Sequence, residues 1–348
     1  MKRIKLTDLA MYACVVLSLF FMDSIKDNVI AAIKSCAYTI VPSLFVMCVL
    51  STIITKSGAI ERLAAVFKID GRYFSAFILG NIGGYPIGAK VLSSLVEDNR
   101  ITKADAERAI CFCFASGPAF CLGVVGGAVF KSKLLGVMLF LSIFLSNLTL
   151  YIFFAVKRAR KKRCGGENDT GSGSKLPFSD LCSSAVVSSA YSMVSICSAI
   201  LFFSAIIAVV YAVAPFAGSF SIVPPILEIS RITSLKYAGL TSFVIVAVLM
   251  SFGGLCVHMQ VKSIASFSLK QFYLTRPVQL LLTAFYALIL YAPAQKYLPA
   301  NVKPSDTEII ISSSDSLIPF VCVLLMIVIA ITHKRNYSTY MHKIVRSH

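Results

Sequence analysis

Two basic residues lie inside apolar segments that glycine and proline interrupt. Lys90 ends the run ILGNIGGYPIGAK at residues 78–90, and Arg231 follows a Pro-Pro pair in a second apolar run. An ionisable group at membrane depth is costly, so each cation requires a partner or a water-filled cavity. Helix N-termini at such breaks also attract carboxylates, because their first amides lack partners and carry partial positive charge. The two cations predict a binding site for a small organic anion, unless both side chains extend to the membrane interface.

Residues near the two cations add polar and flexible groups. Asn81 and Ser116 can donate hydrogen bonds to a solute, and Tyr85 can stack on a planar ring or pack against its neighbours. Glu228 either balances Arg231, binds a coupling cation or titrates during transport. Glycines let the backbone approach a solute closely. The predicted substrate-binding residues are Asn81, Gly83, Gly84, Tyr85, Lys90, Ser116, Gly117, Glu228, Ser230 and Arg231.

No catalytic or cofactor-binding pattern accompanies these residues in the sequence. The chain has no His/Glu metal spacing, Walker loop or nucleophile elbow. Its 11 cysteines are scattered without a CxxC pair, which fits buried small side chains better than metal ligands or disulfides. We therefore expect a protein that is not an enzyme and that holds neither a metal nor a cofactor.

Composition places these residues in a lipid bilayer. Hydrophobic residues make up 57% of the chain and charged residues 14%, and the mean hydropathy is +0.81. Apolar stretches of roughly 20 residues, enough to cross a ~30 Å hydrocarbon core, recur along the chain. They predict an all-α polytopic membrane protein with about eight transmembrane helices. The predicted spans are 9–22, 36–55, 109–130, 134–156, 194–213, 238–258, 274–292 and 317–332.

Basic clusters predict how these spans are oriented. The formal net charge is +17, and Lys and Arg gather at Lys2–Lys5, Lys157–Arg163 and His333–Arg346. Such clusters between spans mark the cytoplasmic side, which predicts cytoplasmic N- and C-termini and no nucleic-acid partner. Every cluster obeys this rule if the two broken runs, 73–92 and 216–235, are re-entrant hairpins that enter and leave on one face. The alternative is that one or both runs cross the membrane fully.

The order of the elements predicts an internal inverted repeat. Residues 110–122 and 245–257 both break an apolar helix after a serine, and each follows a Gly/Pro-broken run and precedes another span. With two hairpins the copies run in opposite directions, as in carriers whose solute site lies where broken helices meet. The predicted units are an N-terminal span and connection at 1–35, a first repeat at 36–156, a basic, Gly/Ser-rich cytoplasmic linker with an amphipathic segment at 157–192, a second repeat at 193–292, and an external loop, last span and basic tail at 293–348.

Four short motifs carry a family resemblance. The chain reads GYPIGAK at 84–90, ITKADAER at 101–108, SGP at 116–118 and LEIS at 227–230. In this order they resemble the membrane proteins with nucleoside-recognition, or Gate, domains, and among these the sporulation integral membrane proteins of the YlbJ type. The resemblance covers most of residues 40–290. It departs from the family pattern after Ser230, where Arg231 and Ile232 replace a common glycine.

The resemblance implies a transporter of a spore-forming bacterium. Its implied solute is dipicolinate, a planar aromatic dianion, moved from the mother cell toward the forespore across the outer forespore membrane. The implied partners are this anion, the lipid bilayer, and either further copies of the chain or other sporulation membrane proteins. The residues themselves fit a nucleoside or another small solute equally well. A membrane scaffold for spore assembly that transports nothing is the alternative from another class.

Overall fold

The computed structural model describes residues 12, 15–67, 69–162, 177–213, 222–234 and 239–294. Every regular element in these ranges is helical. Four helices are long and apolar enough to cross a membrane, or up to five if one bent pair forms a single span, so the predicted all-α polytopic class is confirmed. Residues 9–11, 13 and 14 of span 9–22, the linker stretch 163–176, and the predicted loop, span and tail from residue 295 onward lie outside the described residues. The predicted number of eight spans stays a prediction.

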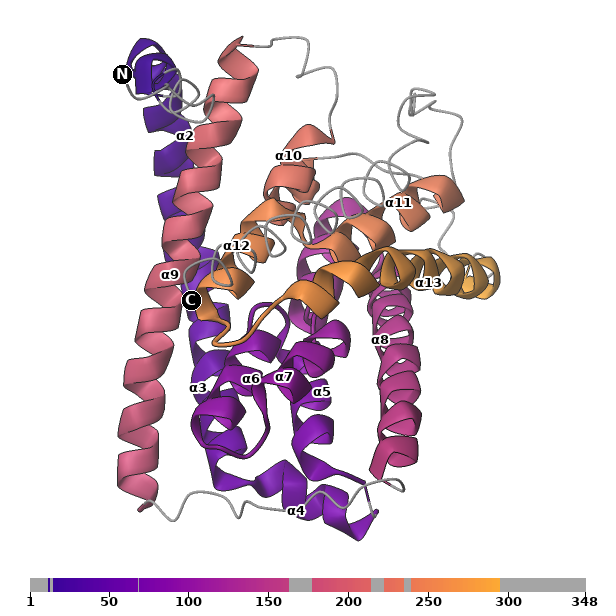
Figure 1. Cartoon of the computed structure of the whole chain (residues 1–348). Coiled ribbons are helices and arrows are strands. Elements are labelled where there is room, and N and C mark those ends of the chain that lie inside the picture. The colour runs from indigo at the N-terminus through magenta and orange to yellow at the C-terminus, as the bar shows by residue number, and fades with distance from the viewer. Residues whose placement is uncertain are drawn as a thin grey trace, which may run out of the picture.

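Two long helical rods run side by side along one flank of the molecule (Figure 1). The first comprises α2 (Met22–Ser35), a π-helical stretch at Cys36–Ile40 and α3 (Val41–Ser57), and α9 (Phe178–Val213) packs along it in the opposite direction. The predicted span 36–55 is therefore part of a longer rod. Within the predicted unit 157–192, α9 begins at Phe178, so the amphipathic segment is the first part of this helix.

The first broken run folds into a helical hairpin. After α4 (Ala59–Val66), α5 (Gly71–Gly83) and α6 (Ile87–Glu97) pack against each other. Their 13 and 11 residues give lengths of only ~20 and ~17 Å, too short to cross a ~30 Å core. Gly84 makes the turn with φ 80°, a conformation that favours glycine.

Ionic and backbone contacts tie the two ends of this hairpin together. Arg72, at the start of α5, donates to the Arg100 carbonyl beyond the end of α6 at 3.2 Å. Asp70, just before α5, forms ion pairs with Arg72 at 3.2 Å and with Arg158 at 2.9 Å. Arg158 belongs to the last turns of α8, directly before the basic linker. Both ends of the hairpin thus lie at the same end of α8, which is the arrangement that a re-entrant hairpin requires.

The predicted span 109–130 is a broken helix. It consists of the last residue of α7 (Lys103–Ala109), a 3-10 turn at Ile110–Phe112, a stretch without regular structure, and a π-helix at Ala119–Val129, followed by α8 (Lys133–Lys162). The π-helix packs tightly on α8: a Cβ added to Gly136 would lie 2.7 Å from the Cys121 carbonyl oxygen. Small residues commonly allow such close helix packing in membranes.

Residues 222–234 are the described part of the second broken run. They hold a five-residue helix, α10 (Val223–Leu227), and a 3-10 helix at Ile229–Ser234 that packs against it, and the re-entrant hairpin over 216–235 stays a prediction. α11 (Gly239–Phe252) and α12 (Gly254–Ile264) follow, then α13 (Lys270–Ala294). Gly253, with φ 83°, breaks the predicted span 238–258.

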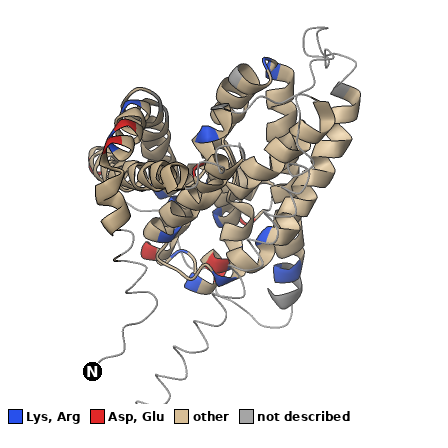
Figure 2. Ribbon diagram, turned by 90° about the horizontal axis from the view of Figure 1, so that it is seen from above, with Lys and Arg blue, Asp and Glu red and all other residues tan. Residues whose placement is uncertain are grey.

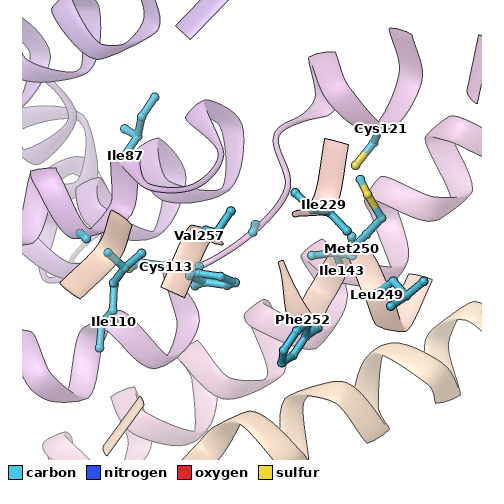
Figure 3. Close-up of a cluster of buried hydrophobic side chains, with 14 of the residues drawn as sticks. Ile87, Ile110, Cys113, Cys121, Ile143, Ile229, Leu249, Met250, Phe252 and Val257 are labelled. Atoms are coloured by element: carbon cyan, nitrogen blue, oxygen red, sulfur yellow. The ribbon is translucent and has the colours of Figure 1, made fainter. Parts of the chain in front are cut away.

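The core lies where these broken elements pack against α8 and α13. Figure 3 shows side chains from both halves converging there, with Cys121 of the π-helix turned toward Met250 of α11 and Ile229 close beside them. All three are at most 4% exposed. Charged residues are sparse on the described helices (Figure 2). The core therefore brings together segments that the sequence places more than a hundred residues apart.

Candidate functional site

The turn of the first hairpin rests directly on the first chain break. A Cβ added to Gly84 would lie 2.7 Å from the Gly117 nitrogen, so only glycines allow these two backbones to approach so closely. The Tyr85 N–H donates to the Ala115 carbonyl at 2.7 Å. In the first turn of α6, a Cβ on Gly88 would overlap the Cys113 carbonyl oxygen. The hairpin and the break thus form one tightly packed unit.

The second half repeats this contact, and the two breaks touch each other. A Cβ added to Gly254 would lie 3.1 Å from the Ile229 nitrogen, so the second break rests on the segment after α10. The Ser116 hydroxyl of the first break donates to the Met250 carbonyl near the end of α11 at 3.3 Å. We call this meeting point the junction and define it as residues 84–86, 113–118, 228–229 and 253–254.

Side chains from other helices bind the carbonyls that the first break leaves without helical partners. Backbone that lies in a membrane protein must be satisfied by the protein itself, because lipid offers no hydrogen bonds. Four carbonyls between residues 111 and 115 each accept a hydrogen bond from another segment, three from side chains and one from a backbone N–H. Arg276 donates to Cys111 at 3.2 Å, Asn81 to Phe112 at 3.1 Å, Asn147 to Phe114 at 3.1 Å, and the Tyr85 N–H to Ala115.

Some of the predicted substrate-binding residues of the first half lie in the junction, and others hold the backbone around it. Tyr85 and Ser116 lie in the junction, where Ser116 donates to the Tyr85 hydroxyl at 2.7 Å and the Tyr85 ring lies 5.1 Å from that of Phe114. Asn81 is fully buried, and its amide bonds the protein's own Phe77 and Phe112 carbonyls. We predicted Asn81 as a donor to a solute, but both of its N–H groups are already used to hold the break.

Gly83 and Gly117 serve close packing in this structure. A Cβ on Gly83 would lie 2.8 Å from Cδ1 of Ile87, inside the hairpin itself. A Cβ on Gly117 would lie 3.2 Å from the Ile82 carbonyl oxygen. Both glycines therefore set how closely the hairpin approaches the break.

Glu228 closes a local turn. Its side chain is only 4% exposed, and it accepts hydrogen bonds from the Ser230 N–H at 3.0 Å and from the Ser230 hydroxyl. Arg231 follows in the same 3-10 helix and interacts electrostatically with Tyr211, near the end of α9. Glu228 and Ser230 are thus a structural pair, placed at the edge of the junction.

Lys90 lines a separate polar pocket between α3, α6, α9 and the end of α12. The pocket has a volume of about 770 Å³. Lys90 is 7% exposed, and its ammonium donates to the Ser189 hydroxyl of α9 at 2.9 Å. Hydroxyl groups dominate the remaining wall, from Thr52, Ser93, Ser94, Ser183, Ser184, Ser188, Tyr191, Ser192, Ser195 and Ser263.

The charges around this pocket leave Lys90 without an ionic partner. Lys56, Glu97 and Asp180 also line the pocket, but within the part of the chain that the structure describes Lys90 forms no ion pair. Buried cations are normally paired, because burial removes their hydration. The same described residues contain no group of three or more His, Cys, Asp or Glu side chains placed to hold a metal ion.

The structure does not bring Lys90 and Arg231 together. The α9 residue that Lys90 contacts is Ser189, and the α9 residue within electrostatic range of Arg231 is Tyr211. These two residues lie about 30 Å apart along the helix at ~1.5 Å rise per residue. Neither Glu228 nor Arg231 lines the Lys90 pocket. A single anion site built from both cations, as the sequence predicted, is therefore absent from the described conformation.

Sequence reasoning missed the polar residues that α13 contributes. Arg276, Gln279 and Thr283 are each fully buried, and Gln279 donates to the Phe114 carbonyl at 3.4 Å and to Asn147. All three lie in the predicted span 274–292. An arginine and a glutamine inside an apolar span are a signal in themselves, because polar groups at that depth usually face a protein interior.

One curated protein supports part of the predicted resemblance. Over 117 residues the chain is 28% identical to the sporulation integral membrane protein YlbJ of Bacillus subtilis (strain 168). The match covers 31% of this chain and 29% of that relative, so it spans less than a third of the relative's length. No family model matches the chain, and no solved structure does. The Gate-domain assignment stays a prediction. The protein is an all-α integral membrane protein, similar in part to a sporulation integral membrane protein.

Proposed function

We propose that this protein transports a small organic anion, dipicolinate, from the mother cell toward the forespore during sporulation, across the outer forespore membrane. The observation that carries the proposal is Lys90, a buried cation that lines a polar pocket and that, among the described residues, is held by a hydroxyl group without an ion pair. The partial similarity to a sporulation integral membrane protein supports the biological setting.

The Lys90 pocket has the properties of an entry site for an anion. A volume of about 770 Å³ lies within the ~300–1,000 Å³ of typical small-molecule pockets. Hydroxyl groups can donate to carboxylate oxygens, and the ammonium supplies the charge. The Ser189 hydroxyl is a neutral partner, so an incoming carboxylate replaces a bond to a neutral oxygen with an ion pair. Lys56, on the same wall, adds a second positive charge.

The junction supports transport over simple binding. Two chain breaks from different halves meet in the core, and each rests on its own broken segment. Carriers with inverted repeats use such discontinuous helices to form a path that opens to alternate sides. The two long rods pack antiparallel. Their helices α3 and α9 occupy equivalent places in the two copies of the proposed repeat. The aromatic pair Tyr85 and Phe114 offers a surface for a planar ring at the same place.

Uptake by reconstituted vesicles tests the proposal. Purified protein in liposomes is expected to carry labelled dipicolinate inward, and Lys90→Gln is expected to reduce the initial rate at least ~10-fold, because a charged hydrogen bond is lost. Lys103→Gln is the matched control, since Lys103 is exposed at the start of α7 and does not line the pocket.

Two results would contradict the proposal in different ways. Equal rates for Lys90→Gln and wild type would contradict the role of the pocket. No uptake by wild-type vesicles, together with normal dipicolinate accumulation in cells that lack the protein and form misshapen spores, would favour a scaffold that transports nothing. Uptake of labelled nucleosides in preference to dipicolinate would show that the solute is a nucleoside and not dipicolinate.

A further inference from the structure

Arg276 is a fully buried cation that touches both chain breaks. Its guanidinium donates to the Cys111 carbonyl at 3.2 Å and to the Ser251 carbonyl at 3.4 Å. The charged group also lies 4.6 Å from the centre of the Phe114 ring and 4.5 Å from that of Phe272. Carbonyls and aromatic faces thus stand where a carboxylate would be expected.

The hydrogen-bonding capacity of Arg276 exceeds what the protein uses. Its Nε–H has no hydrogen-bond partner, and among the residues that the structure describes no carboxylate pairs with it. Buried arginines in membrane proteins are costly and usually paired, and buried donors without an acceptor are rare. The two bonds that Arg276 does make are long and end on neutral oxygens, so they are weak for a guanidinium.

The surroundings place this cation beside the predicted aromatic surface. Phe114 contacts Arg276 with its ring and Tyr85 at 5.1 Å between ring centres. His258 lies 5.6 Å from the same ring, and Gln279 donates to the Phe114 carbonyl. Nδ1 of His258 and Oε1 of Gln279 are acceptors that also lack partners. They suit a water molecule or hydroxyl that accompanies an anion, and not the anion itself.

We propose that Arg276 is an anion-binding residue beside the junction, which a carboxylate of the solute engages after it leaves the Lys90 pocket. This inference rests on the proposed function. A carboxylate accepts two parallel bonds from a guanidinium and is a stronger acceptor than a backbone carbonyl. It therefore displaces the Cys111 and Ser251 carbonyls. Because these carbonyls belong to the two different breaks, the exchange of partners releases both breaks together.

Ligand binding to purified protein in detergent tests this inference independently of transport. The probes are dipicolinate and its uncharged analogue pyridine-2,6-dimethanol, and the readout is the ligand-induced rise in melting temperature over a concentration series. Arg276→Gln is expected to bind dipicolinate at least ~10-fold more weakly than wild type, with no change toward the analogue. Arg108→Gln is the control, because its side chain is 45% exposed.

Arg276→Lys is the second variant, in case the glutamine variant does not fold. It keeps the charge but loses the planar fork, so we expect it to fold and to bind dipicolinate severalfold more weakly than wild type. A folded Arg276→Gln or Arg276→Lys with wild-type affinity would overturn the inference and leave transport standing. Wild-type protein that binds dipicolinate through Arg276 but carries none into vesicles would contradict the proposed function alone. No binding by wild-type protein overturns both.

Discussion

The two halves of the molecule hold their chain breaks in different ways. In the first half, α5 and α6 form a complete hairpin whose glycines press against the Cys113 carbonyl, and a hydrogen bond from Arg72 to the Arg100 carbonyl ties its two ends. In the second half, the described segment is a five-residue helix and a 3-10 helix, and the Glu228 side chain closes the turn between them. The closest backbone contacts thus lie in the first half, whereas one side chain closes the turn of the second.

This difference indicates which half moves. Where glycines bring two backbones into direct contact, neither segment can shift without the other, because a packed interface moves only as a unit. A turn that one carboxylate closes can open when that carboxylate changes partners. We therefore expect the second-half segment to rearrange during transport while the first-half hairpin moves as a rigid body. The predictions that follow test this contrast.

Glycine substitutions should give the largest effects. Gly88→Ala forces a Cβ into the Cys113 carbonyl, and we expect a loss of about 2–4 kcal/mol in the free energy of unfolding. Gly254→Ala, with φ 73° and a nearest backbone atom at 3.1 Å, should lose about 1–2 kcal/mol. Gly127→Ala, which would meet nothing within 4 Å, should stay within about 0.5 kcal/mol. Equilibrium unfolding in mixed micelles measures all three. Equal losses at Gly88 and Gly254 would remove the contrast between the halves.

Asn147 tests the carbonyl network of the first break. Its amide donates to Asn81 at 2.7 Å and to the Phe114 carbonyl at 3.1 Å, and both acceptors are buried. Asn147→Leu keeps the volume but leaves these groups unsatisfied, so we expect a loss of about 2–3 kcal/mol. Ser142→Ala is the control in the same helix, because the Ser142 hydroxyl bonds only its own helix. A loss for Asn147→Leu no larger than that of the control would show that the network contributes little.

Glu228 tests the turn of the second half. Glu228→Ala removes the acceptor for the Ser230 N–H and hydroxyl, and we expect a loss of about 1–2 kcal/mol. Glu228→Gln keeps one acceptor oxygen and should lose less. The same unfolding measurement, paired with vesicle uptake, shows whether Glu228 serves the stability of the turn or the transport step itself. Wild-type stability together with abolished uptake in Glu228→Gln would indicate that the charge of Glu228, and not its turn, is what transport requires.

The smallest effect should come from Asp105, in α7 just after the hairpin. Burial alone would raise the pKa of Asp105, but hydrogen bonds from Arg108 and Thr102 outweigh it and hold the pKa below its ordinary value. A carboxyl whose pKa falls on folding adds stability above its unfolded pKa of ~3.9 and loses it as pH falls through the lower folded pKa. Wild type should therefore exceed Asp105→Asn in melting temperature by a constant margin from pH 5 to 8. A margin that shrinks within that range would contradict the lowered pKa.

The class of the fold and the places where helices break were readable from the sequence. Mean hydropathy and span length predict a polytopic helical protein, and the positions of glycine and proline mark the turn at Gly84 and the breaks at Gly117 and Gly253. These features are local: each depends on residues within a few positions along the chain. Tyr85 and Ser116, which both belong to the broken motifs, are hydrogen-bonded in the structure although 31 residues separate them.

Contacts between distant segments were not predictable in this way. Asn81 was expected to bind a solute, but it serves the Phe112 carbonyl, 31 residues away. Lys90 and Arg231 share a charge and a type of motif, yet they lie toward opposite ends of α9. Arg276 was overlooked because it lies in a predicted unbroken span, although Pro277 adjoins it. A polar side chain reveals its role only when the fold shows which unsatisfied group lies opposite.

The hydrogen bond between Lys90 and Ser189 has a consequence for the kinetics of loading. A lysine that is held by a carboxylate must break an ion pair before it can accept a substrate, whereas a hydroxyl is released at little cost. Capture of the anion should therefore be fast and readily reversible.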